Sequence, residues 1–243
     1  MILDTTLWQQ LIGEFLGTMV LVLLGDGVVA GNVLKKTKST DTGWLLITLG
    51  WGLAVTIAVY SVGWLSPAHL NPAVTVGMAI TGNVGWGVVV PYIIAQVAGG
   101  FAGATLVWIH YMPHFGATDD QEAILAVFST GPAIRRSAYN LISEAIATAV
   151  LVYGLLAFTQ GEFTDGLNPV VVGFLIASIG ISLGGTTGYA INPARDLGPR
   201  IAHQILPIAN KGDSDWGYAW VPIAGPFIGA ALAALLYQVL PLG

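Results

Sequence analysis

The strongest constraint on the fold of this chain is a series of six long apolar stretches that contain few charged residues. A helix needs about 20 apolar residues to cross a hydrocarbon core of about 30 Å. Only 9% of the residues are charged, whereas soluble domains carry about 25%, so the composition indicates a polytopic membrane protein. The expected spans are residues 7–29, 44–65, 86–111, 139–158, 169–185 and 218–240.

Two further apolar segments, residues 71–83 and 192–206, are too short to cross the membrane. Because Asn is a good helix cap and Pro is tolerated at the first helical position, each segment is expected to be a re-entrant half-helix. The pair Gly198-Pro199 predicts a kink or an end in the second one. The same triplet opens both segments, as Asn71, Pro72 and Ala73 in the first and as Asn192, Pro193 and Ala194 in the second.

The two halves of the chain repeat each other. "LIGEFLGTMVLV" from Leu11 aligns with "LISEAIATAVLV" from Leu141, and "HLNPA" from His69 aligns with "AINPA" from Ala190. Each half holds three spans and one half-helix, and an odd number of spans inverts the second copy. We therefore expect one all-α transmembrane channel domain over 1–243: six transmembrane helices plus two re-entrant half-helices, in inverted repeats of about 1–125 and 126–243.

The inverted repeats predict that the two half-helix N-termini meet near the membrane midplane. Each terminus carries roughly +0.5 of an elementary charge, which opposes cations and protons. The amide groups of Asn71 and Asn192 can offer N–H donors to a hydroxyl there. A narrow lumen with one polar and one apolar wall suits a small uncharged polyol. Backbone carbonyls are expected along it at Pro67, Ala68, His69, Leu70, Gly188, Tyr189, Ala190 and Ile191.

Three ionisable residues lie at membrane depth, where such groups are costly and usually functional. Glu14 and Glu144 occupy matching repeat positions. Each is expected to accept backbone N–H groups of a re-entrant loop, the alternative being a proton relay. Arg195 follows the second triplet and is expected to line the lumen, the alternative being an ion pair with Asp196.

At these residues the sequence resembles the major intrinsic proteins, the aquaporin and glycerol-facilitator family, over nearly its whole length. The resemblance implies a filter of Trp51, Gly180, Tyr189 and Arg195. Water-selective members typically have Phe and His at the first two positions, and glycerol facilitators commonly have Phe at the third. Asp196 is similar to the glycerol-facilitator branch and is expected to support its loop.

The resemblance further implies a passive channel for glycerol and other small uncharged solutes. Water is expected to pass as well, whereas ions and protons are excluded. A homotetramer in the lipid bilayer of the plasma membrane, with both termini cytoplasmic, is implied as well. The positive-inside rule favours the opposite orientation, because odd-numbered connectors carry Lys35, Lys36, Lys38, Arg135, Arg136 and Lys211. We expect the orientation of the family.

Other functions have weaker support. A water-only channel is disfavoured by Gly180 and Trp51, and a proton-coupled transporter would use the two glutamates as relays. "GISLG" at 180–184 matches the GxSxG pattern of serine hydrolases, but small residues at helix contacts explain it better, so no enzyme is expected.

No cofactor and no metal are expected either. The chain has no cysteine, and three of its four histidines, His110, His114 and His203, lack metal-ligand spacing. No basic run indicates a nucleic-acid partner. The start lacks a basic region, so the first span is expected to be retained, and residues 113–137 are expected to form an irregular surface loop.

Overall fold

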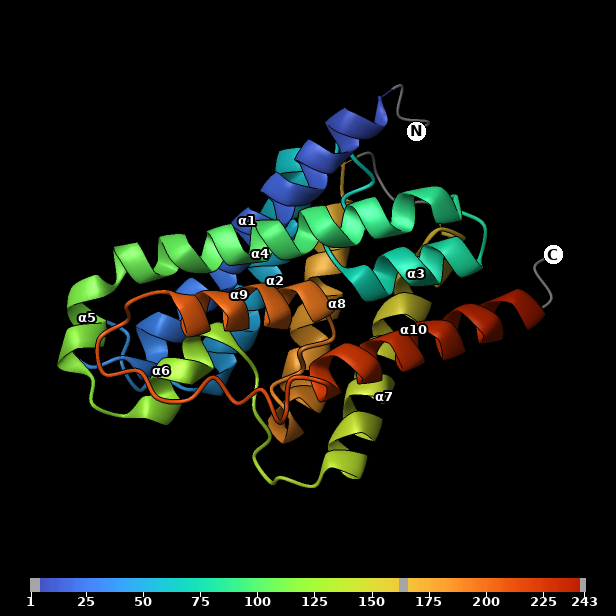
Figure 1. Ribbon diagram of the computed structural model, residues 1–243. Helices are drawn as coiled ribbons and strands as arrows, with labels where there is room; N and C mark the ends of the chain where they lie inside the picture. Colours follow the sequence, from blue (N-terminus) through green and yellow to red (C-terminus); the bar gives the residue numbers. More distant parts are fainter. Residues whose placement is uncertain (1–4, 162–165, 241–243) are drawn as a thin grey trace.

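The computed structural model describes residues 5–161 and 166–240, and within these ranges every regular element is a helix (Figure 1). Six helices are long and apolar enough to cross a membrane. They comprise α1 (Leu7–Val33), α2 (Trp44–Val62), α4 (Val89–His110, after the 3-10 turn Trp86–Val88), α7 (Ser137–Phe158), α8 (Asn168–Leu183, followed by the 3-10 turn Gly184–Thr186) and α10 (Val221–Val239).

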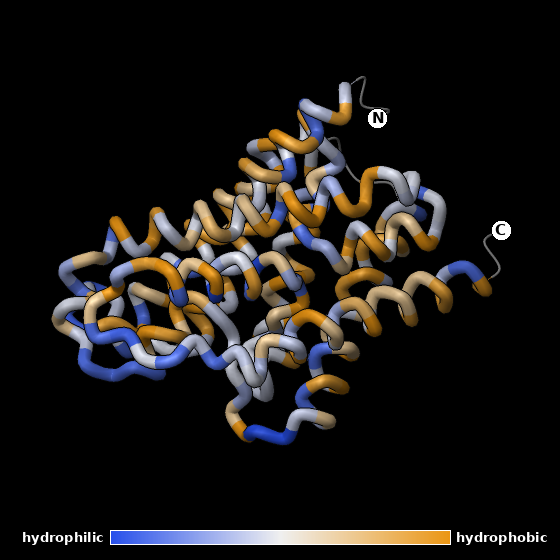
Figure 2. The backbone as a smooth tube through the Cα atoms, viewed as in Figure 1, coloured by the Kyte–Doolittle hydropathy of each residue, from blue (hydrophilic) through white to orange (hydrophobic). Residues whose placement is uncertain are grey.

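All six expected spans are confirmed, with shifts at their ends. Helix α1 continues to Val33, beyond the expected residue 29, and α2 stops at Val62, before the expected residue 65. Figure 2 shows apolar residues along the long helices and hydrophilic segments gathered in the loops at one end. Many large apolar side chains on these helices are exposed, such as Leu53, Phe174 and Leu232. Such a surface suits contact with lipid.

The two half-helices are α3 (Pro72–Ile80) and α9 (Pro193–Ile205). Each begins as expected: the side chain of Asn71 accepts from the Ala73 amide, and that of Asn192 accepts from the amides of Ala194 and Arg195. At about 1.5 Å per residue, neither helix is long enough to cross a 30 Å core. The expectation of two re-entrant segments is confirmed.

Helix α9 does not end at Gly198-Pro199, contrary to one of the two expected outcomes. It continues through Pro199 to Ile205. A Cβ atom at Gly198 would lie 2.6 Å from the carbonyl oxygen of Val97 in α4, so the glycine permits close contact between these two helices. The resulting burial of α9 offsets the hydrogen bond that Pro199 cannot make.

The prediction of an irregular loop over 113–137 is wrong. This segment contains most of α5 (Met112–Ala117) and all of α6 (Gln121–Phe128). The Asp120 carboxylate accepts from two backbone amides and caps α6. Ile124, Val127 and Phe128 follow at helical spacing and are fully buried. The apolar face of α6 therefore docks on the bundle, against α1 and α9.

The long helices pair in a corresponding way in the two halves. Helix α1 packs along α4, and α7 packs along α10. A Cβ at Gly99 of α4 would lie 2.3 Å from the carbonyl of Phe15, and one at Gly229 of α10 would lie 2.1 Å from that of Ala145. Glycine at these positions allows the helix backbones to touch. In Figure 1 the start of α1 and the end of α10 lie away from α5 and α6.

Candidate functional site

A cavity of about 490 Å³ lies between the two halves of the bundle and is bordered by both half-helix starts. Its lining includes Trp51, Asn71, Asn192 and Arg195. The loops before the half-helices contribute Pro67, Ala68, His69, Leu70, Tyr189, Ala190 and Ile191. Most of the predicted pore residues thus border one space, although they come from distant parts of the chain.

The two asparagines form a reciprocal pair across the centre. Asn71 Nδ2 donates to the carbonyl oxygen of Ile191, and Asn192 Nδ2 donates to that of Leu70, each over 2.8 Å. The sequence predicts that the carbonyls of Leu70 and Ile191 face the lumen. In the structure each of them accepts from the opposite asparagine. Each Nδ2 retains a second N–H.

Glu14 holds the loop before α3. Its Oε1 accepts from Ser66 Oγ at 2.9 Å and from the His69 amide at 3.0 Å. Its Oε2 accepts from the Leu70 amide at 2.7 Å and from Gln96 Nε2 at 2.8 Å. The carboxylate is fully buried, and four donors satisfy it.

Glu144 makes the equivalent set of bonds to the loop before α9. Its Oε1 accepts from Thr187 Oγ1 at 2.6 Å and from the Ala190 amide at 3.0 Å, and its Oε2 accepts from the Ile191 amide at 2.9 Å. The three donors lie 121 positions after Ser66, His69 and Leu70 respectively, the same offset that relates the two triplets. The repeat therefore extends to individual hydrogen bonds.

Both loops hold non-glycine residues in the left-handed backbone region, at matching positions. Ala68 and Leu70 have φ values of 52° and 53°, and Tyr189 and Ile191 have values of 40° and 45°. Each such residue costs on the order of 1–3 kcal/mol and persists only where its surroundings enforce it. The bonds to Glu14 and Glu144 supply that constraint.

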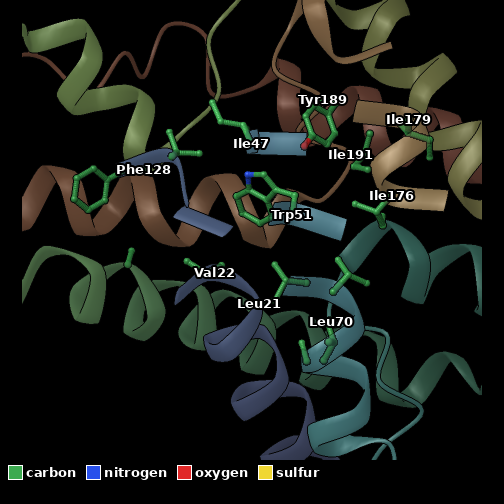
Figure 3. Close-up of a cluster of buried hydrophobic side chains, with 14 of the residues drawn as sticks. Leu21, Val22, Ile47, Trp51, Leu70, Phe128, Ile176, Ile179, Tyr189 and Ile191 are labelled. Atoms are coloured by element: carbon green, nitrogen blue, oxygen red, sulfur yellow. The ribbon is translucent and has the colours of Figure 1, made fainter. Parts of the chain in front are cut away.

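Arg195, Trp51 and Tyr189 come together at one end of the cavity. The Arg195 guanidinium carbon lies 4.2 Å from the centre of the Trp51 ring. Figure 3 shows Tyr189 close to Trp51, with its hydroxyl oxygen pointing toward that side. This hydroxyl is buried and has no hydrogen-bond partner within the described ranges. A cationic donor and two aromatic faces therefore share this end.

Gly180, an expected filter residue, lies against the Tyr189 ring rather than beside open space. A Cβ at Gly180 would lie 2.7 Å from Tyr189 Cζ and 2.9 Å from a methyl group of Thr48. The Tyr189 ring occupies the room that the glycine leaves. Within residues 5–161 and 166–240, Gly180 and Gly188 do not border the cavity, and neither do Pro72, Ala73, Pro193 or Ala194.

Arg195 does not pair with Asp196. The Asp196 carboxylate accepts from the Thr130 amide and hydroxyl, each at 2.8 Å, and forms a buried ion pair with Arg200. Asp196 thus ties the segment before α7 to α9. The carboxylate that faces Arg195 belongs to Asp26 of α1, at 3.7 Å from Nη1.

Sequence reasoning missed Asp26 and Gln96. Asp26 interrupts the apolar run "LVLLGDGVV", and that alone marks an ionisable residue at membrane depth. Gln96 carried no such signal, because an uncharged side chain inside a span is common. Its amide joins Glu14 to Thr75.

The residues that a hydrolase or a metal site would use do not form such a site in the described part of the chain. Ser182 is exposed on α8 and is not one of the cavity-lining residues in the described chain. His69 Nδ1 lies 3.2 Å from Thr75 Oγ1. No cluster of three or more potential metal ligands occurs among the residues that the structure describes.

Six apolar spans and two half-helices, meeting around a lined cavity, define a multi-pass membrane protein of the channel type. A family model described as major intrinsic protein matches residues 1–237. The chain therefore belongs to the major intrinsic protein family.

Named relatives are close in sequence and in length. The glycerol uptake facilitator protein 3 of Lactiplantibacillus plantarum is 66% identical over 232 residues, which cover 96% of this chain and 97% of that protein. The glycerol uptake facilitator protein of Streptococcus pneumoniae is 58% identical over 231 residues, 95% of this chain and 99% of that one. The X-ray structure of the aquaglyceroporin from Plasmodium falciparum superimposes with a TM-score of 0.87 at 31% identity, covering 98% of both chains.

Proposed function

We propose that this protein is a passive membrane channel for glycerol and other small uncharged solutes, that it also passes water, and that it excludes ions and protons. The observation that carries the proposal is the grouping of Arg195, Trp51 and Tyr189 at one end of a cavity bordered by both half-helix starts. The names of the relatives, glycerol uptake facilitators, support glycerol as the solute.

In this proposal the three side chains form the filter and recognise the two faces of a polyol. Arg195 donates hydrogen bonds to successive hydroxyl groups, and the rings of Trp51 and Tyr189 contact the CH groups. The stacking of Arg195 on Trp51 keeps the guanidinium plane against the wall, and a cation over an aromatic ring is worth about 0.5–2 kcal/mol. Gly180 contributes indirectly, because it accommodates the Tyr189 ring.

At the centre of the cavity, the remaining Nδ2 N–H groups of Asn71 and Asn192 donate to a solute oxygen. The oxygen atoms of both side chains cap their helices, so the amides offer donors rather than acceptors at this point. The two helix N-termini add positive potential. A cation or a hydronium ion would meet donors and positive ends together, which opposes its entry.

Along the cavity wall, backbone carbonyls act as acceptors for hydroxyl and water protons. Pro67, Ala68 and His69 serve in the first half and Tyr189 and Ala190 in the second. Glu14 and Glu144 hold these segments in place, and Asp196, at the start of α9, holds Thr130 and Arg200. The Glu14 carboxylate accepts four hydrogen bonds and the Glu144 carboxylate accepts three, which argues against a relay that must release and rebind protons.

We propose one channel domain made of inverted repeats, about 1–125 and 126–243. The matching loop bonds, the matching left-handed residues and the equivalent pairing of α1 with α4 and α7 with α10 support it. We also propose a homotetramer in the plasma membrane with both termini cytoplasmic, as the family resemblance implies. The exposed apolar side chains of the spans support a lipid surround.

A direct test measures glycerol uptake into proteoliposomes with and without a proton gradient, together with current across planar bilayers. We expect uptake that follows the glycerol gradient in both directions, is unchanged when a protonophore collapses the proton gradient, and carries no current. Glycerol-dependent current, or uptake lost with the gradient, would support a coupled transporter instead.

The Tyr189 hydroxyl gives a second, more local prediction. This oxygen is buried beside the filter without a hydrogen-bond partner among the described residues. Its removal in Tyr189→Phe should alter the ratio of glycerol to water permeability by a factor of about two to ten. That factor corresponds to one hydrogen bond of about 0.5–1.5 kcal/mol. Stopped-flow light scattering on the same vesicle preparation gives both rates. An unchanged ratio in well-folded protein would mean that the hydroxyl does not face the solute path.

A further inference from the structure

Asp26 is a buried carboxylate with no structural task among the loops. It lies in the second half of α1, is fully buried, and neither of its oxygens has a hydrogen-bond partner in the described part of the chain. The offset of 130 that relates Glu14 to Glu144 brings Asp26 onto Leu156, so the second half has no equivalent charge. A buried, unpaired carboxylate at membrane depth is costly and calls for a functional explanation.

Asp26 lies beside two of the proposed filter residues, Arg195 and Trp51. Asp26 Oδ1 lies 3.7 Å from Nη1 of Arg195, and that nitrogen is also buried without a hydrogen bond within residues 5–161 and 166–240. The neighbouring Gly25 lies against Trp51: a Cβ there would come within 2.2 Å of the ring. The turn containing Gly25 and Asp26 therefore contacts both the ring on which Arg195 stacks and the guanidinium itself.

Asp26 is the carboxyl group that faces Arg195, and it has no hydrogen-bond partner among the residues that the structure describes. The other nearby carboxylate, Asp196, is occupied by Thr130 and Arg200. At 3.7 Å the contact with Asp26 is longer than a hydrogen bond, so it acts as an attraction between charges. Such an attraction is strong in surroundings that exclude water. It draws one edge of the guanidinium toward α1, while the side chain also borders the cavity.

We propose that Asp26 is a positioning residue of the filter: it compensates the charge of Arg195 and holds the guanidinium back against the α1 side of the cavity. This inference rests on the proposed glycerol channel function. Without the carboxylate, the uncompensated guanidinium moves toward the acceptors that the cavity offers. The passage then narrows, which hinders a polyol more than water.

The test compares Asp26→Asn, which keeps the shape and removes the charge, with Asp26→Glu, which keeps the charge. We expect Asp26→Asn to lower the ratio of glycerol to water permeability roughly tenfold, within the range for a group displaced by about an ångström. In Asp26→Glu the carboxylate approaches Arg195 and the ratio stays within about twofold of the wild type. Stopped-flow rates are normalised to the amount of folded channel. A wild-type ratio in folded Asp26→Asn would overturn the proposal.

A second background separates action through Arg195 from a general effect on packing. We expect Asp26→Asn to leave the ratio unchanged in channels that already carry Arg195→Val, because no guanidinium remains to be positioned. The Arg195→Val background also allows the test if Asp26→Asn alone folds poorly. Removing both partners of a buried ion pair destabilises a protein less than removing one of them. An equal fall in both backgrounds would overturn the proposal. Absence of glycerol flux in the wild type would instead refute the proposed function itself.

Discussion

We expect Gly180→His to lower glycerol permeability at least about tenfold and water permeability far less, because misfit in a tight pocket costs about 10- to 200-fold. The reason is indirect. A Cβ at Gly180 would lie 2.7 Å from Cζ and 2.8 Å from the hydroxyl oxygen of Tyr189, so the new side chain displaces that ring toward the cavity. The carbon skeleton of a polyol cannot shrink to pass, whereas single-file water can.

The matched control for this effect is the double variant Gly180→His with Tyr189→Ala. Removal of the ring vacates the room that the new imidazole needs, so glycerol permeability should recover in part. Stopped-flow light scattering measures both solutes for the three channels. If Gly180→His reduces glycerol and water equally in well-folded protein, or if the double variant recovers nothing, the assignment of this filter is wrong.

We expect Glu144→Gln to reduce the yield and thermal stability of the folded protein more than it alters solute selectivity. The carboxylate accepts from the Thr187 hydroxyl and from the amides of Ala190 and Ile191. A glutamine has only one acceptor oxygen, and its NH₂ group would face a donor. Each buried donor that loses its acceptor costs about 1–3 kcal/mol, so the free energy of unfolding should fall by roughly 3 kcal/mol.

The measurement is the melting temperature of purified protein in detergent, together with the ratio of glycerol to water permeability of the fraction that folds. Glu14→Gln is expected to behave alike, because Glu14 holds the other loop through four donors. The exposed Glu122→Gln serves as the neutral control. Normal yield and melting temperature combined with lost transport would favour a proton relay.

Much of the fold followed from local chemistry that sequence displays directly. The six spans were readable because the hydrocarbon core demands about 20 apolar residues per helix. The half-helices were readable because Asn-Pro is a strong helix start in both copies. The repeat of Glu14 as Glu144 indicated the support of the two loops, since a buried carboxylate needs donors and the loops have unpaired amides.

What could not be predicted depends on contacts between distant segments. Gly180 and Tyr189 were both expected in the filter. That the Tyr189 ring fills the space beside Gly180 is visible only once α8 is packed against the loop before α9. The pairing of Asp26 with Arg195 joins α1 to α9 in the same way. The helices within 112–128 were missed because they are short, 6 and 8 residues, and lie between polar connectors.

Conduction of glycerol as well as water is tested by two stopped-flow measurements on the same proteoliposomes of the wild-type protein. One applies an impermeant osmolyte and reports water flux. The other applies a glycerol gradient and reports shrinkage followed by re-swelling. We predict that re-swelling in glycerol is much faster than in protein-free liposomes. Rapid water flux with re-swelling no faster than in protein-free liposomes would contradict the account and indicate a channel for water alone.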